Sequence, residues 1–192
     1  FRPEAAETLL REEDKELGVA LIEMGAGTTD IAVFHEAKIR HLGTVPFGGN
    51  NVTNDIVHGL QVTQQDAERL KERFGAAWEL LVPESDVIEL PSTPGQGARS
   101  AHRQVLAHIM RMRLQETFEF ALDEVTRAGY HQRLPAGIVL TGGGAQAPGI
   151  VELAREVFAM PVRVGKTGQG LAGLTDSVES PRFAVLAGLA LY

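Results

Sequence analysis

The fold of this chain is decided by the stretch Glu23-Met24-Gly25-Ala26-Gly27-Thr28-Thr29-Asp30. Two apolar runs of strand length, residues 19–22 and 31–34, flank it, so we expect the glycines at a tight strand-turn-strand corner. Glycine tolerates positive φ and lets the backbone approach a ligand closely. The two threonine hydroxyls and the N–H groups of the turn suit a phosphate, and Glu23 is placed to face its metal ion. An ordinary glycine hairpin is the alternative.

The corner differs from two better-known phosphate motifs. A Walker loop and a dinucleotide fingerprint both open a helix, and neither pattern occurs in this sequence. The acidic residue before the glycines and the hydroxyl pair after them favour a phosphate over a plain hairpin.

Bulk properties exclude several classes of protein. The 192 residues suffice for one good-sized domain or two small lobes. A formal net charge of −7 argues against a nucleic-acid surface, and the lack of cysteine excludes disulfides and thiolate metal sites. No apolar run approaches the roughly 20 residues of a spanning helix. The chain begins with Phe1 instead of methionine, so we expect a piece of a longer protein.

Hydrophobic periodicity predicts the elements of the first half. After a charged helical lead-in at 4–16, closely spaced strands at 18–24, 30–35 and 38–45 favour antiparallel pairing. A helix is expected with Asn50 as its N-cap and Gly59 at its end. A second helix is expected over 63–74, with a polar start and Gly75 as its stop.

The second half alternates helices and strands. A short strand at 87–90 and a loop at 91–97 precede a long helix over 103–128, roughly 35–40 Å in length. Its apolar stripe consists of Leu106, Met110, Leu114, Phe118, Leu122 and Val125. The remaining expected elements are a strand at 138–140, a helix around 150–158, a strand at 162–164, a glycine-rich loop at 165–173 and a helix at 181–191. This order predicts an α/β or α+β lobe whose sheet is interrupted by a mostly helical insertion.

A second glycine cluster, Gly142-Gly143-Gly144, follows the strand at 138–140. Ligands of open α/β sheets bind at the carboxyl ends of strands. A backbone without side chains can lie flat against a planar base. Alone, the cluster is equally well explained as a plain strand-to-helix turn. Together, the two clusters predict one loop for phosphate and one for adenosine.

The order and separation of these clusters resemble the second lobe of the actin–Hsp70–sugar kinase superfamily, and within it the FtsA family of bacterial cell-division proteins. The resemblance rests on residues 16–33, 45–56, 66–71, 136–145, 173–176 and 187–189. It implies an α/β, ribonuclease H-like lobe of an actin-like ATPase, with a mixed sheet and flanking helices. Residues 1–17 would be a lead-in from a first lobe, 18–48 and 135–192 the nucleotide-binding subdomain, and 49–134 a mostly helical inserted subdomain.

The resemblance also implies roles for matching positions. The β- and γ-phosphates of ATP would be held by Gly25, Ala26, Gly27, Thr28 and Thr29. Gly48, Gly49 and Asn50 would approach the nucleotide from the next strand end. Glu68 and Lys71 would reach its ribose and base edge, and Gly142, Gly143 and Gly144 would line its adenosine. Glu23 would bind its Mg²⁺ through water. The spacing of Glu68 and Lys71 puts both on one helical face, although without the resemblance a solvated surface ion pair is the preferred explanation.

Five positions depart from the family pattern or lie outside the cleft. Glu23 stands where aspartate is usual, and Mg²⁺ demands near-ideal geometry. Ala26 replaces a glycine, which requires a negative φ. We therefore expect a slow ATPase at most, with ATP acting chiefly as a conformational ligand. Arg113 and Glu116 match positions that face the FtsZ tail or a neighbouring subunit, whereas Met112 replaces a common proline.

The implied function is that of an ATP-binding actin-like protein that polymerises and links FtsZ filaments to the membrane at the division septum. Its partners would be the carboxyl-terminal tail of FtsZ and further copies of itself, on the cytoplasmic face of the inner membrane, with membrane contact only through a tail outside this chain. A Hsp70-type ATPase or chaperone, a sugar kinase, and a shape-determining or pilus-assembly actin homologue are the alternatives. Half of the cleft would lie outside this chain, so we expect the chain alone to bind ATP weakly or not at all. The six histidines lack the spacing of a metal site, and no nucleophile elbow is present.

Overall fold

The computed structural model describes residue 6, residues 9–91 and residues 97–165. Its elements are α2 (Glu12–Leu17), β1 (Val19–Met24), β2 (Thr29–His35), β3 (Lys38–Val45), α3 (Gly49–Leu60), α4 (Gln64–Phe74), the 3₁₀ turn η1 (Glu79–Leu81), β4 (Val87–Leu90), β5 (Arg99–His102), α5 (Arg103–Arg127), β6 (Ile138–Thr141), the 3₁₀ turn η2 (Gly143–Gln146), α6 (Ile150–Phe158) and β7 (Val162–Val164). Most of the predicted loop at 91–97, the glycine-rich loop after Gly165, the helix at 181–191 and the motifs at 173–176 and 187–189 lie outside the described residues.

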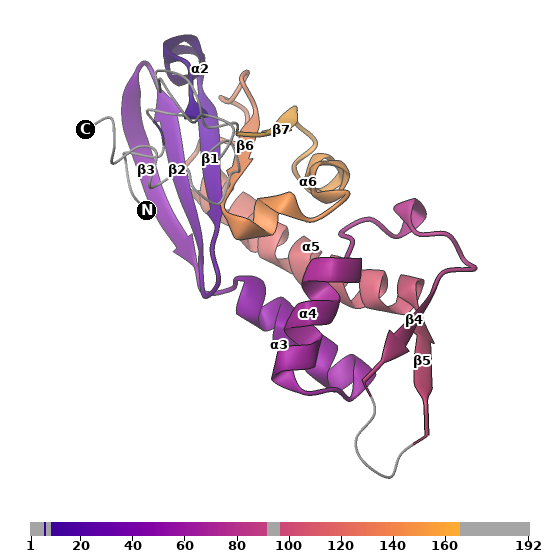
Figure 1. The fold of residues 1–192 in the computed structure, drawn as a ribbon. Helices are drawn as coiled ribbons and strands as arrows, with labels where there is room; N and C mark the ends of the chain where they lie inside the picture. The colour runs from indigo at the N-terminus through magenta and orange to yellow at the C-terminus, as the bar shows by residue number, and fades with distance from the viewer. Residues whose placement is uncertain (1–5, 7–8, 92–96, 166–192) are drawn as a thin grey trace, which may run out of the picture.

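A five-stranded mixed sheet forms one end of the molecule, with strand order β3-β2-β1-β6-β7 (Figure 1). The first three strands pair antiparallel, as the close spacing predicted, whereas β6 runs parallel to β1 and β7 parallel to β6. The turn between β2 and β3 consists of Glu36 and Ala37, with φ values of 54° and 57°. Positive φ at both positions is the geometry that follows the right-handed twist of a hairpin.

Strand β1 is buried on both faces, which explains its continuous apolar sequence. Ala20, Ile22 and Met24 belong to the main core, which also contains the buried residues of α5. Val19 and Leu21 point to the opposite face and pack in a second cluster, together with Ala6, Leu9 and Leu10 from the amino-terminal segment. Because side chains alternate along a strand, Glu23 shares the face of Leu21.

Helix α5 connects the sheet to the insertion and contacts α3, α6, β2 and β3 (Figure 1). The predicted apolar stripe is confirmed in five of its members, while Leu122 is partly buried against the same core. One apolar cluster therefore runs without a break from Ile22 in the sheet through Phe118 to Leu70 on α4 and Ile88 on β4. Within the described part of the chain, none of the helices has the length and apolar character needed to cross a bilayer.

Two predicted details of α3 are wrong. The helix begins at Gly49 with Gly48 as its N-cap, so Asn50 lies inside the first turn. Its end is formed by Gln61, which adopts the left-handed conformation with φ 53°, and not by Gly59. A Cβ atom at Gly59 would lie 2.5 Å from Cδ1 of Ile109 on α5, so this glycine allows the two helices to pack closely.

The insertion contains a small hairpin that the sequence pattern predicted only in part. The strand β4 was expected, but its partner β5 was not, because its sequence Arg-Ser-Ala-His is polar and follows a loop-like stretch. Arg99 of β5 donates to the carbonyls of Leu60 and Gln61 and thereby caps α3. The predicted helix over 63–74 is confirmed as α4, and the first residue of its polar start is its N-cap: the Thr63 hydroxyl accepts a hydrogen bond from the N–H of Asp66 at 3.2 Å.

Candidate nucleotide-binding site

The two glycine clusters meet at the carboxyl end of β1. Gly142 has a φ of +86°, and a Cβ atom there would lie 2.5 Å from the carbonyl oxygen of Met24, the residue before the corner. A Cβ atom at Gly144 would lie 2.9 Å from the Cβ of Met24. This close backbone approach confirms that both bends belong to one end of the sheet.

The corner at residues 25–28 is hydrogen-bonded to the turn at the start of α3. Inside the corner, the Gly25 N–H donates to the Thr28 carbonyl at 2.9 Å. From the turn, the N–H groups of Gly49 and Asn50 donate to the carbonyls of Gly25 and Ala26 at 2.9 and 2.8 Å. A Cβ atom at Gly48 would lie 2.7 Å from both of these carbonyl oxygens, so only glycine permits this contact.

The backbone conformation of the corner differs from what its glycines suggested. Neither Gly25 nor Gly27 has a positive φ, so these glycines provide space instead of an unusual dihedral angle. A Cβ atom at Gly27 would meet no heavy atom within 4 Å. Ala26 has no positive φ either, which satisfies the condition for its replacement of a glycine.

Three successive N–H groups of the corner are not used in hydrogen bonds within the part of the chain that the structure describes. Ala26, Gly27 and Thr28 are exposed, and their N–H groups have no acceptor among the residues that the structure describes. Successive backbone donors at a turn form a concave site that attracts anions. The N–H groups of the neighbouring turn are used within the protein instead, including that of Gly48, which donates to Asn51 Oδ1 at 2.9 Å.

The two threonines of the corner have different surroundings. Thr28 is exposed, whereas Thr29 is fully buried and donates its hydroxyl proton to the Phe47 carbonyl at 2.9 Å. The expectation that both hydroxyls face a phosphate is therefore wrong for Thr29, whose hydroxyl instead links the corner to the backbone at Phe47. The ring of Phe47 lies 5.4 Å from the guanidinium of Arg113 and 5.3 Å from the ring of Phe120.

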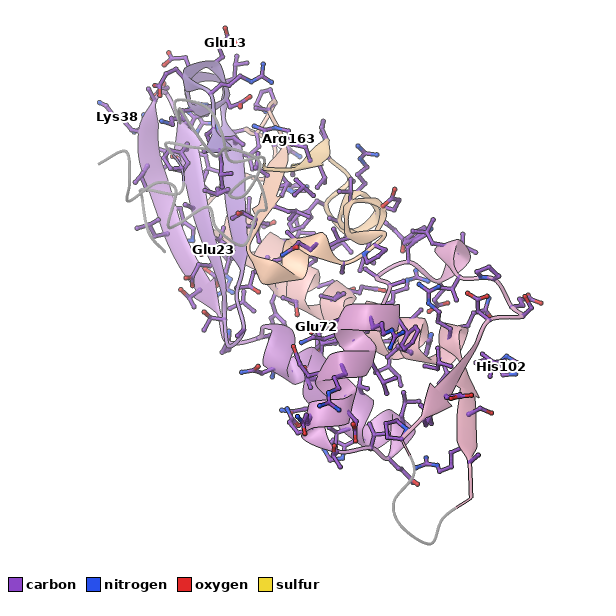
Figure 2. The ribbon with its side chains drawn as sticks, in the orientation of Figure 1. Glu13, Glu23, Lys38, Glu72, His102 and Arg163 are labelled. Atoms are coloured by element: carbon purple, nitrogen blue, oxygen red, sulfur yellow. The ribbon has the colours of Figure 1, made fainter. Side chains whose placement is uncertain are left out.

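Two carboxylates lie beside the corner on one face of the sheet. Glu23 on β1 is the direct cross-strand partner of Asp30 on β2, so both side chains project from the same face (Figure 2 labels Glu23). The Thr44 hydroxyl donates to Asp30 Oδ1 at 2.8 Å. Asp30 closes the sequence motif but was not predicted as a site residue; the pairing register of the strands identifies it.

This pair of carboxylates fits a Mg²⁺ ion that arrives with a phosphate. Mg²⁺ is usually held by one or two carboxylates together with substrate phosphates and water.

Glu68 and Lys71 lie together on α4, and the buried Thr53 of α3 joins them. The Lys71 ammonium donates to Glu68 Oε2 at 2.7 Å, to Thr53 Oγ1 at 2.8 Å and to the Gly49 carbonyl at 3.1 Å. Burial raises the pKa of Glu68, but hydrogen bonds from Lys71 and Thr53 and the charge of Lys71 outweigh it, and the net pKa is below its ordinary value. The cluster borders a cavity of about 520 Å³ lined by Asn50, Thr53, Gln64, Gln65, Glu68 and Arg69.

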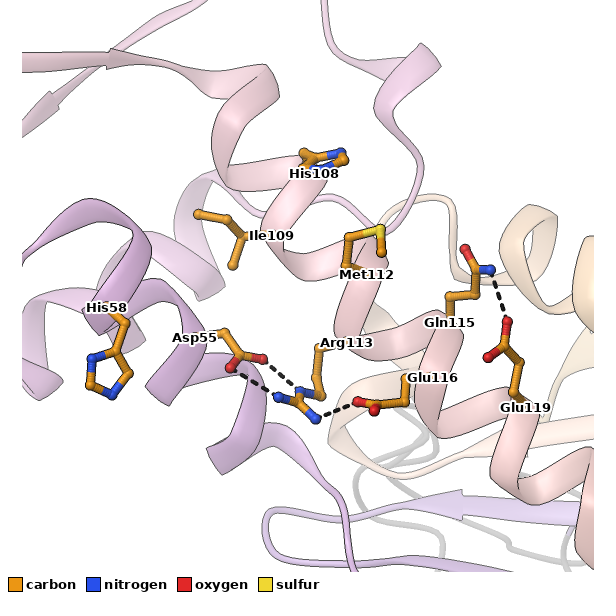
Figure 3. Close-up of a pocket in the computed structure, with 9 residues that line it drawn as sticks. All are labelled: Asp55, His58, His108, Ile109, Met112, Arg113, Gln115, Glu116 and Glu119. Carbon is orange, nitrogen blue, oxygen red and sulfur yellow. Dashed lines mark hydrogen bonds and ion pairs between the residues drawn. The ribbon is translucent and has the colours of Figure 1, made fainter.

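A second cavity, of about 590 Å³, lies between α3 and α5 and contains Arg113 and Glu116 (Figure 3). Arg113 binds both oxygens of Asp55, at 2.6 and 3.1 Å, and also pairs with Glu116. The hydrogen bond with Asp55, helped by the charges of Asp55 and Glu116, raises the pKa of Arg113 against the opposing effect of burial. Asp55 was not predicted, because it lies 58 residues from Arg113 and only the fold brings them together.

Comparison with known proteins identifies the family. The family model described as "Cell division protein FtsA" matches residues 20–188. This chain belongs to the FtsA family. It is 43% identical to FtsA of Pseudomonas aeruginosa over 188 residues and 36% identical to FtsA of Escherichia coli K12 over 192 residues. These alignments cover 98% and 96% of this chain but 45% and 46% of those proteins, so the chain spans about half the length of the curated FtsA relatives it matches.

Solved structures show the actin-like fold of this FtsA-family chain. MreB 5 of Spiroplasma citri bound to AMPPNP has a TM-score of 0.72 at 17% identity, with 99% of this chain and 56% of that chain covered. The type IV pilus biogenesis complex PilM–PilN gives 0.73 at 17% identity, with 99% and 51% covered. The predicted α/β lobe with a mixed sheet and flanking helices is thereby confirmed.

Proposed function

We propose that this chain is the nucleotide-binding half of an actin-like cell division protein that binds ATP with Mg²⁺ and assembles into filaments. The observation that carries the proposal is the row of three exposed residues, Ala26, Gly27 and Thr28, whose N–H groups have no acceptor among the described residues and whose turn is hydrogen-bonded to the start of α3. These donors would bind the β- and γ-phosphates. Gly142, Gly143 and Gly144 would receive the adenosine; the first and third of them lie against Met24 at the same end of the sheet.

The remaining roles follow from position. Glu23 and Asp30 would hold Mg²⁺, largely through water, and the ion would offset the charge of the phosphates. Glu68 would bind the ribose. The nucleotide acts chiefly by favouring the conformation that it binds best, and hydrolysis is slow at most. The solved S. citri MreB 5, which shares this fold, carries AMPPNP.

The groove between α3 and α5 is our proposed site for the FtsZ carboxyl-terminal tail. Three carboxylates, on Asp55, Glu116 and Glu119, line it together with the single guanidinium of Arg113, so its net charge is negative. Ile109 and Met112 add apolar surface, and Met112 is 54% exposed. Such a groove suits a short peptide that carries both apolar and basic side chains. A tail outside this chain would attach the protein to the cytoplasmic face of the inner membrane at the septum.

The nucleotide proposal is tested with Gly27→Ala in the full-length protein, using calorimetric titration with Mg-ATP. A methyl group at this position meets no protein atom within 4 Å, so stability should not change. The methyl group would nevertheless project beside the donors, and we expect ATP affinity to fall at least about tenfold, which is a loss of about 1.4 kcal/mol.

Gly97→Ala is the matched control, because a Cβ atom at Gly97 also meets nothing within 4 Å but lies in the insertion. It should leave ATP affinity unchanged. Equal affinities for wild type and Gly27→Ala, or no ATP binding by the wild type, would refute the proposal.

The partner proposal is tested by binding of a synthetic FtsZ tail peptide to the full-length protein. Glu119→Lys reverses a charge in the groove without removing the Asp55–Arg113 pair, because Glu119 is bonded to Gln115 instead. Peptide affinity should fall, and the loss should shrink at high salt. Failure of the wild type to bind the peptide would exclude FtsZ as the partner.

A further inference from the structure

We propose that Arg111 couples the insertion, residues 49–134, to the glycine loop at 142–149, so that a ligand bound by the loop stabilises the segment at 77–82. The inference rests on the proposed function, because this loop is the proposed adenosine site. It goes beyond that function by assigning the side chain through which nucleotide binding reaches the insertion. Arg111 is a positioning residue in this role and does not contact the ligand.

The loop at 142–149 is fixed at its start and open in its middle. A Cβ atom at Gly142 would lie 2.5 Å from the carbonyl oxygen of Met24, so this end is packed against the sheet. Gly143 is exposed, and a Cβ atom there would meet no heavy atom of the described residues within 4 Å. A ligand can therefore approach the loop at Gly143 without displacing a side chain.

The other end of the loop is packed against the segment at 77–82. The Ala77 N–H donates to the Pro148 carbonyl at 2.7 Å. Gly149 has a φ of +81°, and a Cβ atom there would lie 2.3 Å from the Cβ of Trp78. Because the two backbones are in such close contact, the end of the loop cannot shift without a matching shift of the segment.

Arg111 on α5 holds this contact together. Its guanidinium pairs with Glu156 of α6 at 3.0 Å and faces Glu79 of η1 at 4.0 Å. It also lies 5.1 Å from the centroid of the Trp78 ring, a distance at which cation and ring attract each other. Helix α6 begins directly after the loop. One side chain thus joins the element that follows the loop to the segment against which the loop is packed.

The partners of Arg111 allow this contact to form and break in the folded protein. Oε1 of Glu79 lies 2.7 Å from Nδ1 of His108, which orients the carboxylate and leaves Oε2 for Arg111. The Nε of Arg111 is buried without a hydrogen-bond partner among the described residues, so the two carboxylates and the Trp78 ring fix its position. The Arg111 and Glu156 side chains are 29% and 47% exposed. Ion pairs at such exposure contribute little each.

The same turn of α5 also carries Arg113. Two residues correspond to a rotation of about 200° around a helix, so Arg111 and Arg113 lie on nearly opposite sides of α5. Arg113 pairs with Asp55 of α3 at 2.6 Å. Helix α5 is therefore held to α6 on one side and to α3 on the other, which connects the loop at 142–149 to the groove.

The test is hydrogen–deuterium exchange of the full-length protein with and without Mg-ATP, with ATP affinity measured separately by calorimetry. Exchange of the Ala77 N–H requires its bond to Pro148 to open, so the rate reports on the contact directly. Couplings between two sites typically amount to about 5–150-fold. We expect Mg-ATP to slow exchange in the segment at 77–82 about fivefold or more in the wild type.

Two variants remove the coupling. Arg111→Met should abolish the slowing at 77–82, whereas Mg-ATP should still slow exchange in the loop at 142–149. Glu156→Ala should have the same effect, and combining the two changes should add nothing, because they break one contact. Glu156 is an exposed residue of α6, so its variant tests the proposal even if Arg111→Met fails to fold.

Arg103 provides the matched control at the start of the same helix. Its side chain is 27% exposed, close to the value for Arg111. Its partners, Asp86 and the Phe74 carbonyl, both belong to the insertion. Arg103→Met should therefore leave the slowing at 77–82 unchanged.

The outcomes separate this inference from the proposed function. A wild type that binds Mg-ATP without any slowing at 77–82 overturns the coupling and leaves the nucleotide site intact. Slowing that persists in Arg111→Met or Glu156→Ala overturns the role of Arg111, as does an equal loss of slowing in Arg103→Met. A wild type that binds no Mg-ATP overturns the proposed function, and this inference with it.

Discussion

The corner at the end of β1 and the groove between α3 and α5 present different chemical groups, the first backbone groups and the second charged side chains. The corner is made of backbone: its donors are N–H groups, and its shape depends on glycines packed against carbonyl oxygens. The groove is made of long charged side chains, with Arg113 held between Asp55 and Glu116. Phosphates, common to all nucleotides, suit the first construction, whereas a partner peptide, which varies in sequence, suits the second.

This contrast predicts how each region responds to substitution. A backbone site has no side chains that can be exchanged gradually, so one added methyl group can prevent its formation. A side-chain site loses one interaction at a time, and partly exposed ion pairs contribute little each and are screened by salt. Four measurements, from the largest expected effect to the smallest, test this difference.

Gly142→Ala should have the largest effect. It combines a φ of +86° with a Cβ atom 2.5 Å from the Met24 carbonyl, and we expect a loss of unfolding free energy on the order of 3 kcal/mol. Gly143→Ala is the control, since a Cβ atom there meets nothing within 4 Å, and it should change stability by less than about 0.5 kcal/mol. Urea unfolding measures both. Similar losses at the two positions would contradict the backbone description of the site.

Thr29→Val should come second. It preserves the shape of a fully buried side chain but leaves the Phe47 carbonyl without its donor, at a cost of about 1–3 kcal/mol. Thr28→Val, at the exposed neighbouring position, should be nearly neutral to stability. If thermal unfolding ranks Thr28→Val as the more damaging change, the hydroxyl of Thr29 does not hold the corner.

Arg113→Ala should lower the unfolding free energy by about 1 kcal/mol, because it removes a bidentate ion pair with Asp55 in which both groups are partly exposed. Most of this loss should disappear in high salt. Arg69→Ala is the matched change, since Arg69 is 68% exposed and pairs weakly with Asp66 at 3.7 Å; it should have almost no effect. A loss at Arg113 that is independent of salt would mean that the groove is held by packing instead of charge.

The smallest effect concerns pH. The pKa of Glu68 in the folded chain lies below its ordinary value of 4.5, so the ionised carboxylate stabilises the fold at neutral pH. This contribution should be fully present above about pH 4.5 and lost as the pH falls through the lower folded pKa. The stabilities of wild type and Glu68→Gln should therefore converge on acidification, which urea unfolding between pH 3 and 7 would show. Divergence towards low pH would contradict the prediction.

The same contrast explains how much could be predicted from sequence. The strands around the corner, the meeting of the two glycine clusters and the helix with a polar start at Thr63 are local or strongly patterned features, and the structure confirms them. A glycine in the sequence does not show why it is there. Gly59 was interpreted as a helix end, although it is a packing position against the side chain of Ile109, whereas a Cβ atom at Gly143 would meet nothing within 4 Å.

Features that depend on distant partners could not be predicted in the same way. The pairing of Asp55 with Arg113, the strand β5 opposite β4 and the burial of the Thr29 hydroxyl under Phe47 each require knowledge of which segments meet. Asp30 is an intermediate case. Its position opposite Glu23 follows from the pairing register of β1 and β2. Composition and hydrophobic periodicity alone do not give this register.

One residue, Phe47, belongs to both regions. Its carbonyl accepts a hydrogen bond from the Thr29 hydroxyl at the corner, while its ring lies 5.4 Å from the guanidinium of Arg113, a residue of the groove, and 5.3 Å from the ring of Phe120. If the proposed nucleotide and peptide both bind, a peptide that shifts the ring of Phe47 would also act on the corner. Thermodynamic linkage would then require each ligand to change the affinity of the other by the same factor, so one coupling free energy, measured from either side, would describe both effects.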